Sequence, residues 1–208
     1  MAEKLAEVRR ILDRYLVEVV EAYDLCPWAR RARLGGEVAV EVLWGEPTAE
    51  AWAAAGEALF AREAIRVAMI VAPESALDPA GLRVVRDRVA FRLPQAGIAH
   101  FHPDAALDLA SPARLVPFLR RSPDPLLQLV PLALLDGVRA APAAAGRTYQ
   151  AQMLGGLVAP PRGDVADRIA LTNHTRVTTE TAAVIGCLDA IAADRRESYA
   201  RAGIRSSR

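Results

Sequence analysis

The sequence is poor in cysteine, in aromatic residues and in excess charge of either sign. Its 208 residues include only two cysteines, Cys26 and Cys187, so the disulfide framework of a small secreted domain is excluded. Aromatic residues make up 5% of the chain, and 26 basic residues against 25 acidic ones leave a net charge of +1. Dedicated nucleic-acid-binding proteins usually carry a basic excess, so we expect no nucleic-acid partner.

Long apolar runs and common catalytic signatures are also missing. No apolar stretch approaches the roughly 18 residues needed to cross a bilayer. The first ten residues, MAEKLAEVRR, carry charges where a secretory signal would carry an apolar segment. The sequence contains no GxSxG, Walker or GxGxxG motif placed after a strand. We therefore expect a cytoplasmic protein with no membrane partner, and the sequence leaves open whether a cofactor is bound.

The composition that remains is typical of one globular domain. Apolar residues make up 52% of the chain and charged residues 25%. A chain of this length buries about 70% of its unfolded surface, so it needs no covalent staple. We expect residues 1–208 to form a single domain, in which 141–163, rich in Ala, Gly and Pro, is a loop or mobile segment. Arginine clusters such as Arg195-Arg196 are predicted to lie on solvated faces.

The first half of the chain alternates between helix and strand patterns. An amphipathic helix is predicted over 3–23, and Pro27 favours a short second helix over 27–33. Val-rich or apolar strands are predicted over 37–43, 66–71 and 97–101, separated by helices at about 48–62 and 79–93. This β-α-β-α-β order predicts an α/β (or α+β) fold with a small, partly parallel sheet of three to four strands flanked by helices.

The second half is predicted to be more helical. Ser-Pro pairs at 111–112 and 122–123 are typical of helix starts, because proline suits the first helical position. The apolar stretch 125–131 fits either a helix or a strand. Two C-terminal helices are expected, over about 165–174 and 179–201.

Three short motifs stand where predicted elements end. In open α/β sheets, ligands bind outside the carboxyl ends of the strands, so we expect residues at such ends to share a site. The motifs are Leu25-Cys26-Pro27-Trp28, Phe101-His102-Pro103-Asp104 and Arg121-Ser122-Pro123-Asp124-Pro125.

The same stretches resemble the bacterial domain-of-unknown-function family numbered 1415. Its members carry Leu-Cys-Pro-aromatic, Phe-His-Pro and Asn-Arg-Ser-Pro-Tyr-Pro motifs in this order, and the resemblance covers roughly residues 10–140, with a weaker match at 167–173. The third motif departs from the family pattern, with Arg120 in place of Asn and Asp124 in place of Tyr, and Gln128 replaces a family histidine. The resemblance implies a bacterial protein, but the family has no established activity that could be carried over.

Cys26 and His102 are the predicted catalytic pair. A thiol at a helix N-terminus near Arg30 should have a lowered pKa, as a nucleophilic or redox cysteine requires. His102 would then act as its base and Asp104 would orient the imidazole. Alternatively, Cys26 is a small buried apolar residue and His102 a hydrogen-bonded structural histidine.

An anion anchor is predicted next to this pair. Arg121 can bind a carboxylate or phosphate bidentately, and Ser122, Trp28 and Arg30 are expected to line the same substrate site. Alternatively, Arg121 braces its loop through carbonyl groups and Ser122 caps a helix.

A metal site is the third interpretation. His100 and His102 share a strand face, and Cys26 or His174 would complete three ligands. The favoured hypothesis is a small cysteine-dependent enzyme acting on a small anionic substrate. A non-catalytic small-molecule binding or scaffold module comes second and a metal-binding protein third. Substrate, reaction class and oligomeric state stay open.

Overall fold

A four-stranded mixed sheet forms the centre of the protein. The computed structural model describes residues 1–134 and 165–205. The strands are β1 (Val38–Val42), β2 (Val67–Val71), β3 (Ala96–Phe101) and β4 (Leu126–Pro131), in the order β1-β2-β4-β3. β1 and β2 are parallel, whereas β4 is antiparallel to both β2 and β3. The predicted fold class is confirmed, and the ambiguous stretch 125–131 is a strand.

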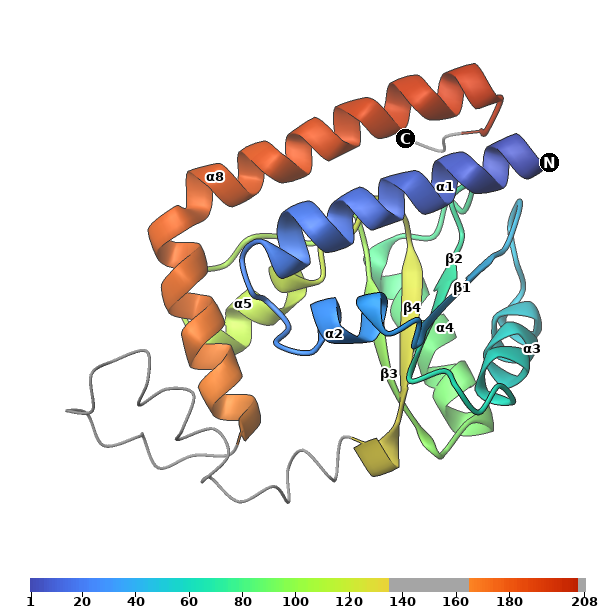
Figure 1. The fold of residues 1–208 in the computed structure, drawn as a ribbon, viewed down its shortest axis with the longest axis horizontal. Helices are drawn as coiled ribbons and strands as arrows, with labels where there is room; N and C mark the ends of the chain where they lie inside the picture. Colours follow the sequence, from blue (N-terminus) through green and yellow to red (C-terminus); the bar gives the residue numbers. More distant parts are fainter. Residues whose placement is uncertain (135–164, 206–208) are drawn as a thin grey trace.

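Helices cover both faces of this sheet (Figure 1). α3 and α4 pack on one face, and α1, its continuation η1 and α8 lie across the other. The helical elements are α1 (Ala2–Tyr15), η1 (Leu16–Glu21), α2 (Ala29–Leu34), α3 (Ala49–Phe60), α4 (Pro79–Arg92), α5 (Pro112–Leu119) and α8 (Val165–Ala202).

Alternation along β2 creates a separate core on each face of the sheet. Met69 and Val71 pack with α1 and α8, whereas Ala68 and Ile70 pack with α3 and α4. Successive side chains of a strand point to opposite faces, so a strand covered on both sides is apolar at every position. This is why the sequence of β2 shows an unbroken apolar run.

Side-chain caps fix the starts of three helices as predicted. Thr48, Asp78 and Ser111 each accept a hydrogen bond from a backbone N–H in the first turn of α3, α4 and α5. The predicted helix start at 122–123 is wrong, because Ser122 lies in the loop that leads into β4 and its hydroxyl donates to the Asp124 carbonyl at 2.6 Å. Pairing of β4 with two strands outweighs the local Ser-Pro signal.

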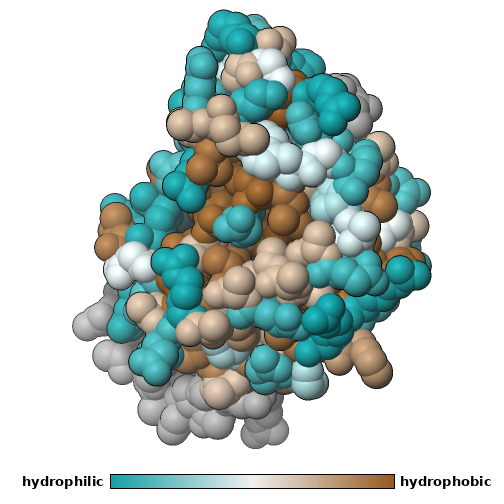
Figure 2. All heavy atoms as spheres, turned by 90° about the vertical axis from the view of Figure 1, so that its right-hand side faces the viewer, coloured by the Kyte–Doolittle hydropathy of each residue, from teal (hydrophilic) through white to brown (hydrophobic). Residues whose placement is uncertain are grey.

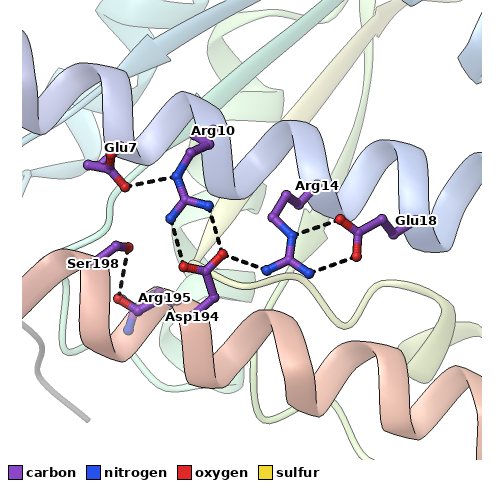
Figure 3. Close-up of polar contacts among 7 residues, drawn as sticks. All are labelled: Glu7, Arg10, Arg14, Glu18, Asp194, Arg195 and Ser198. Carbon is purple, nitrogen blue, oxygen red and sulfur yellow. Dashed lines mark hydrogen bonds and ion pairs between the residues drawn. The ribbon is translucent and has the colours of Figure 1, made fainter.

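α8 pairs with α1 through a charged network (Figure 3). The Asp194 carboxylate accepts two hydrogen bonds of 2.7 Å from Arg10 and one of 2.5 Å from Arg14, which also binds Glu18. α8 consists of two helical segments that meet at a kink at Glu180 (φ −114, ψ 22), which agrees with the prediction of two C-terminal helices, although the first segment continues through 175–179. The α8 residues that pack on the sheet are therefore held in place by α1.

The side of the molecule at β1 carries a recessed apolar area ringed by polar side chains (Figure 2). A cavity of about 360 Å³ lies between the start of α1, the residue after α8 and the loops following β1 and β2; its lining residues are Met1, Lys4, Trp44, Glu74, Gly203 and Arg205. None of the predicted site residues lines it. Among the described helices, none combines the length and apolarity that crossing a membrane requires. The predicted loop 141–163 lies outside the described residues.

Candidate functional site

A second cavity, of about 210 Å³, opens at the carboxyl ends of β2 and β3. β1, β2 and β3 run in one direction and β4 runs against them, so the loop entering β4 reaches the same edge as the loops leaving β2 and β3. Those loops and α8 enclose the cavity. Its lining residues are Ser75, Pro103, Asp104, Arg121, Ser122, Pro123, Pro125, Leu188, Ile191, Ala192, Arg195 and Arg196.

Two of the three sequence motifs meet at this cavity. Pro103 and Asp104 come from the motif after β3, and Arg121, Ser122 and Pro123 come from the motif before β4. A backbone hydrogen bond of 3.0 Å from the His102 N–H to the Arg120 carbonyl joins the two stretches. This is the strand edge at which α/β proteins bind ligands.

The cavity lining carries more positive than negative charge. The lining includes three arginines, Arg121, Arg195 and Arg196, and one acidic residue, Asp104. The positive charge of Arg195 is balanced by Asp124, because the Arg195 Nε donates to the Asp124 carboxylate at 2.7 Å. Across residues 1–134 and 165–205, no carboxylate forms an ion pair with Arg196, which is exposed at the rim.

A buried polar network holds Arg195 in place. Asp124 is 1% exposed and accepts hydrogen bonds from Arg195 and, at 2.6 Å, from the Tyr199 hydroxyl. Arg195 also donates to the Pro73 carbonyl at 3.0 Å, and its guanidinium lies 4.6 Å from the centre of the Tyr199 ring. Burial, and then the Asp124 charge, raise the pKa of Tyr199 far above its ordinary value. The guanidinium beside the cavity therefore has a fixed orientation.

Arg121 bridges the two loops. Its Nε donates to the Pro103 carbonyl at 3.0 Å, and a terminal nitrogen lies 3.9 Å from the exposed Asp189 carboxylate. Arg121 thus braces its loop through a carbonyl group, as the alternative interpretation expects. The side chain is nevertheless 33% exposed and lines the cavity, so its remaining N–H groups can face a ligand.

Cys26 lies away from the cavity, in the turn between η1 and α2. α8 holds this turn, because Asn173 donates to the Leu25 carbonyl at 2.9 Å and Arg176 to the Tyr23 carbonyl at 2.7 Å. Burial raises the pKa of the Cys26 thiol and outweighs the N–H groups of Trp28 and Ala29 that face it. The prediction of a lowered thiol pKa is therefore wrong, because desolvation of the thiolate dominates over the helix start.

The two other residues predicted beside Cys26 also lie outside the cavity lining. Trp28 is 44% exposed, and Arg30 lies on the exposed side of the six-residue helix α2. The reason is that the 25–28 motif follows the helical element η1, whereas the loops that line the cavity follow or precede strands. The second and third motifs supply residues to the lining of this cavity, and the first motif supplies none.

His102 anchors the loops beneath the cavity. It is 2% exposed; its Nε2 lies 2.9 Å from the Leu77 carbonyl, and its Nδ1 lies 3.1 Å from the backbone N–H of Asp104. Nδ1 accepts this N–H, so Nε2 carries the ring proton and donates it to the carbonyl. Both ring nitrogens thus have partners, as in the alternative of a structural histidine.

The predicted metal ligands do not form a cluster. Within the part of the chain that the structure describes, no group of three or more His, Cys, Asp or Glu side chains is placed to hold a metal ion. The His174 ring contacts the Leu109 carbonyl at 2.9 Å, and the Nδ1 atom of His100 is buried without a partner. Burial, then the charges of Arg120 and Arg86, lower the pKa of His100. The metal hypothesis therefore gains no support from this geometry.

The α8 residues at the cavity were missed by the sequence reasoning. Arg195 belongs to a pair assigned to a solvated face, yet it is buried. A signal was available, since Leu188, Ile191, Arg195 and Tyr199 follow one another at three- and four-residue steps along one helix face. An arginine inside such an apolar stripe indicates a buried partner.

No family model, no curated protein and no solved structure matches this chain. The resemblance to family 1415 therefore stays a prediction.

Proposed function

We propose that this protein binds a small anionic molecule in the cavity at the carboxyl ends of β2 and β3, with Arg121 and Arg196 as anchors. The observation that carries the proposal is the lining itself, which includes three arginines and one acidic residue, Asp104. Arg195 is fixed by Asp124, so its charge is partly balanced, whereas Arg196 has no ion-pair partner among the described residues. An anion would supply the missing negative charge.

Guanidinium groups suit this role chemically. Their planar N–H groups match the oxygen pairs of carboxylates and phosphates, and such charge-assisted hydrogen bonds are about twice as strong as neutral ones. Arg121 is already oriented by the Pro103 carbonyl, and Arg195 by Asp124 and the Pro73 carbonyl. Oriented donors lose little conformational entropy on binding, which favours affinity.

Binding is better supported than cysteine-dependent catalysis. Cys26 is absent from the cavity lining, and burial favours its neutral thiol over the nucleophilic thiolate. Ser122 does line the cavity, but its hydroxyl donates to the Asp124 carbonyl. The cysteine-dependent enzyme remains a prediction that thiol labelling can test.

Thermal unfolding with a panel of anions tests the proposal. Phosphate, succinate, benzoate and hexanoate are added at constant ionic strength, and the melting temperature is compared with that in chloride. An anion present at a hundred times its Kd should stabilise the fold by about 2.7 kcal/mol, which corresponds to a rise of roughly 5 to 10 °C.

Matched variants locate the effect. Arg196→Gln and Arg121→Gln should each reduce the rise, whereas Arg201→Gln, an exposed arginine at the end of α8 that does not line the cavity, should retain it. The proposal fails if no anion raises the melting temperature at millimolar concentration, or if all three variants respond like the unmodified protein.

A further inference from the structure

We infer that the anion is an organic monocarboxylate with an apolar chain, and that inorganic phosphate and polyanions are poor ligands. This inference rests on the proposed function and adds the chemical class of the ligand. It is carried by the apolar residues in the cavity lining.

The wall is apolar on two sides. α8 contributes Leu188, Ile191 and Ala192, and the loops contribute proline residues 103, 123 and 125. Leu188 and Ile191 are already buried among core residues, so a ligand placed against them contacts a closed surface. Proline has no backbone N–H, so at these three positions the loops offer no donor to a polar ligand.

The order of residues along α8 gives the ligand a direction. Leu188, Ala192 and Arg196 follow one another at four-residue steps and therefore form a row on one side of the helix. A carboxylate held at Arg196 would direct its chain past the small side chain of Ala192 toward Leu188. Eight residues of helix rise about 12 Å, which leaves room for a chain of several carbon atoms.

The charge balance favours one negative charge on the ligand. Arg121, Arg195 and Arg196 supply three positive charges, and Asp104 in the lining and Asp124 on Arg195 supply two negative ones. Asp189 lies 3.9 Å from Arg121 but is 63% exposed, so solvent screens its charge. This balance leaves a place for at most one negative charge, which suits a monoanion. A polyanion would bring further negative charge toward the lining carboxylate, which is unfavourable in a partly enclosed site.

Isothermal titration with a series of straight-chain carboxylates tests the inference. Acetate, butyrate, hexanoate and octanoate are compared at constant ionic strength, with hexylamine as the same chain with opposite charge and phosphate as the anion without a chain. Each buried methylene should raise affinity about fourfold until the wall is covered. Hexylamine and phosphate should bind far more weakly than hexanoate.

Substitutions at two alanines test where the apolar chain of the ligand lies. Ala192→Leu fills the row between Arg196 and Leu188 and should abolish the chain-length dependence. Ala190→Leu, on the exposed side of α8, makes the same change away from the cavity and should retain it. Thermal unfolding of both variants checks that they fold, and the ligand series on the unmodified protein decides the question without them.

The outcomes separate the inference from the proposed function. If phosphate and acetate bind as tightly as hexanoate and binding still needs Arg196, the anion site stands and the inference on the apolar chain is overturned. If none of these anions binds, both fall. A chain-length dependence that persists unchanged in Ala192→Leu also overturns the inference.

Discussion

Asp124→Asn should strongly destabilise the protein, because it leaves Arg195 charged and buried. In the structure Asp124 accepts hydrogen bonds of 2.7 Å from Arg195 and 2.6 Å from Tyr199. Asparagine keeps one acceptor oxygen, but it loses the negative charge and presents an N–H₂ group to one of these two donors. Removing one partner of a buried ion pair costs about 3 to 5 kcal/mol, and the retained acceptor places the expected cost at the lower end, about 3 kcal/mol.

Equilibrium unfolding in urea measures this cost. With a urea m-value of about 2 kcal/mol/M, a loss of about 3 kcal/mol lowers the midpoint by about 1.5 M. Tryptophan fluorescence reports the transition, because Trp52 of α3 is fully buried in the core that this helix forms with the sheet and α4. Asp87→Asn is the matched control, since this exposed carboxylate pairs with Arg86 at 2.9 Å and should cost less than about 1 kcal/mol.

A double variant identifies the cause. Replacing both partners of a buried pair by uncharged groups is often close to neutral. Arg195→Met in the Asp124→Asn background should therefore recover at least about 1 kcal/mol. The reasoning is refuted if Asp124→Asn costs no more than Asp87→Asn, or if adding Arg195→Met lowers stability further.

Three further predictions concern titratable groups. The pKa of His100 lies below its ordinary value of 6.5. The contribution of His100 to stability is therefore complete above pH 6.5 and is lost as the pH falls toward the folded-state pKa. Urea titrations at several pH values should show that the free energy of unfolding depends less steeply on pH in His100→Gln. The two arginines that bind Asp194 hold the pKa of its carboxyl well below the usual range. The stabilisation of the fold by this carboxylate is therefore present above about pH 4 and lost on acidification. Asp194→Asn should cost about 1 kcal/mol at pH 7 and make acid unfolding less steep, and an unchanged midpoint of acid unfolding would contradict this. Burial of the Cys26 thiol predicts that iodoacetamide labels native protein at pH 7 more slowly than a free peptide thiol, and rapid labelling that Cys26→Ser abolishes would restore the cysteine-enzyme hypothesis.

Much of the fold could be predicted from local patterns. Thr48, Asp78 and Ser111 cap their helices as expected, because capping depends on residues within one turn. β4 could not be assigned, since a short apolar run buried on both faces fits a helix or a strand equally well. Its strand state is decided by pairing with β2 and β3, which lie far from it in the sequence.

The candidate site was only half predictable for the same reason. The loops after β3 and before β4 were expected at a strand edge, and they meet there. The α8 wall could not be foreseen, because Arg195 meets Asp124 across 71 residues of sequence. The prediction of a lowered pKa for Cys26 is wrong because the sequence shows only the helix start, whereas the burial of the thiol depends on the packing of α8 against its turn.

Nuclear magnetic resonance of the arginine Nε–H groups tests the central claim most directly. The Nε–H groups of Arg121 and Arg195 are held by the Pro103 carbonyl and the Asp124 carboxylate, and that of Arg33 is held by Glu21 at 2.6 Å without lining the cavity. Titration with hexanoate at constant ionic strength should shift the signals of Arg121 and Arg195 along one saturable curve and leave that of Arg33 in place. Equal, non-saturating shifts at all three arginines would contradict an anion site in this cavity.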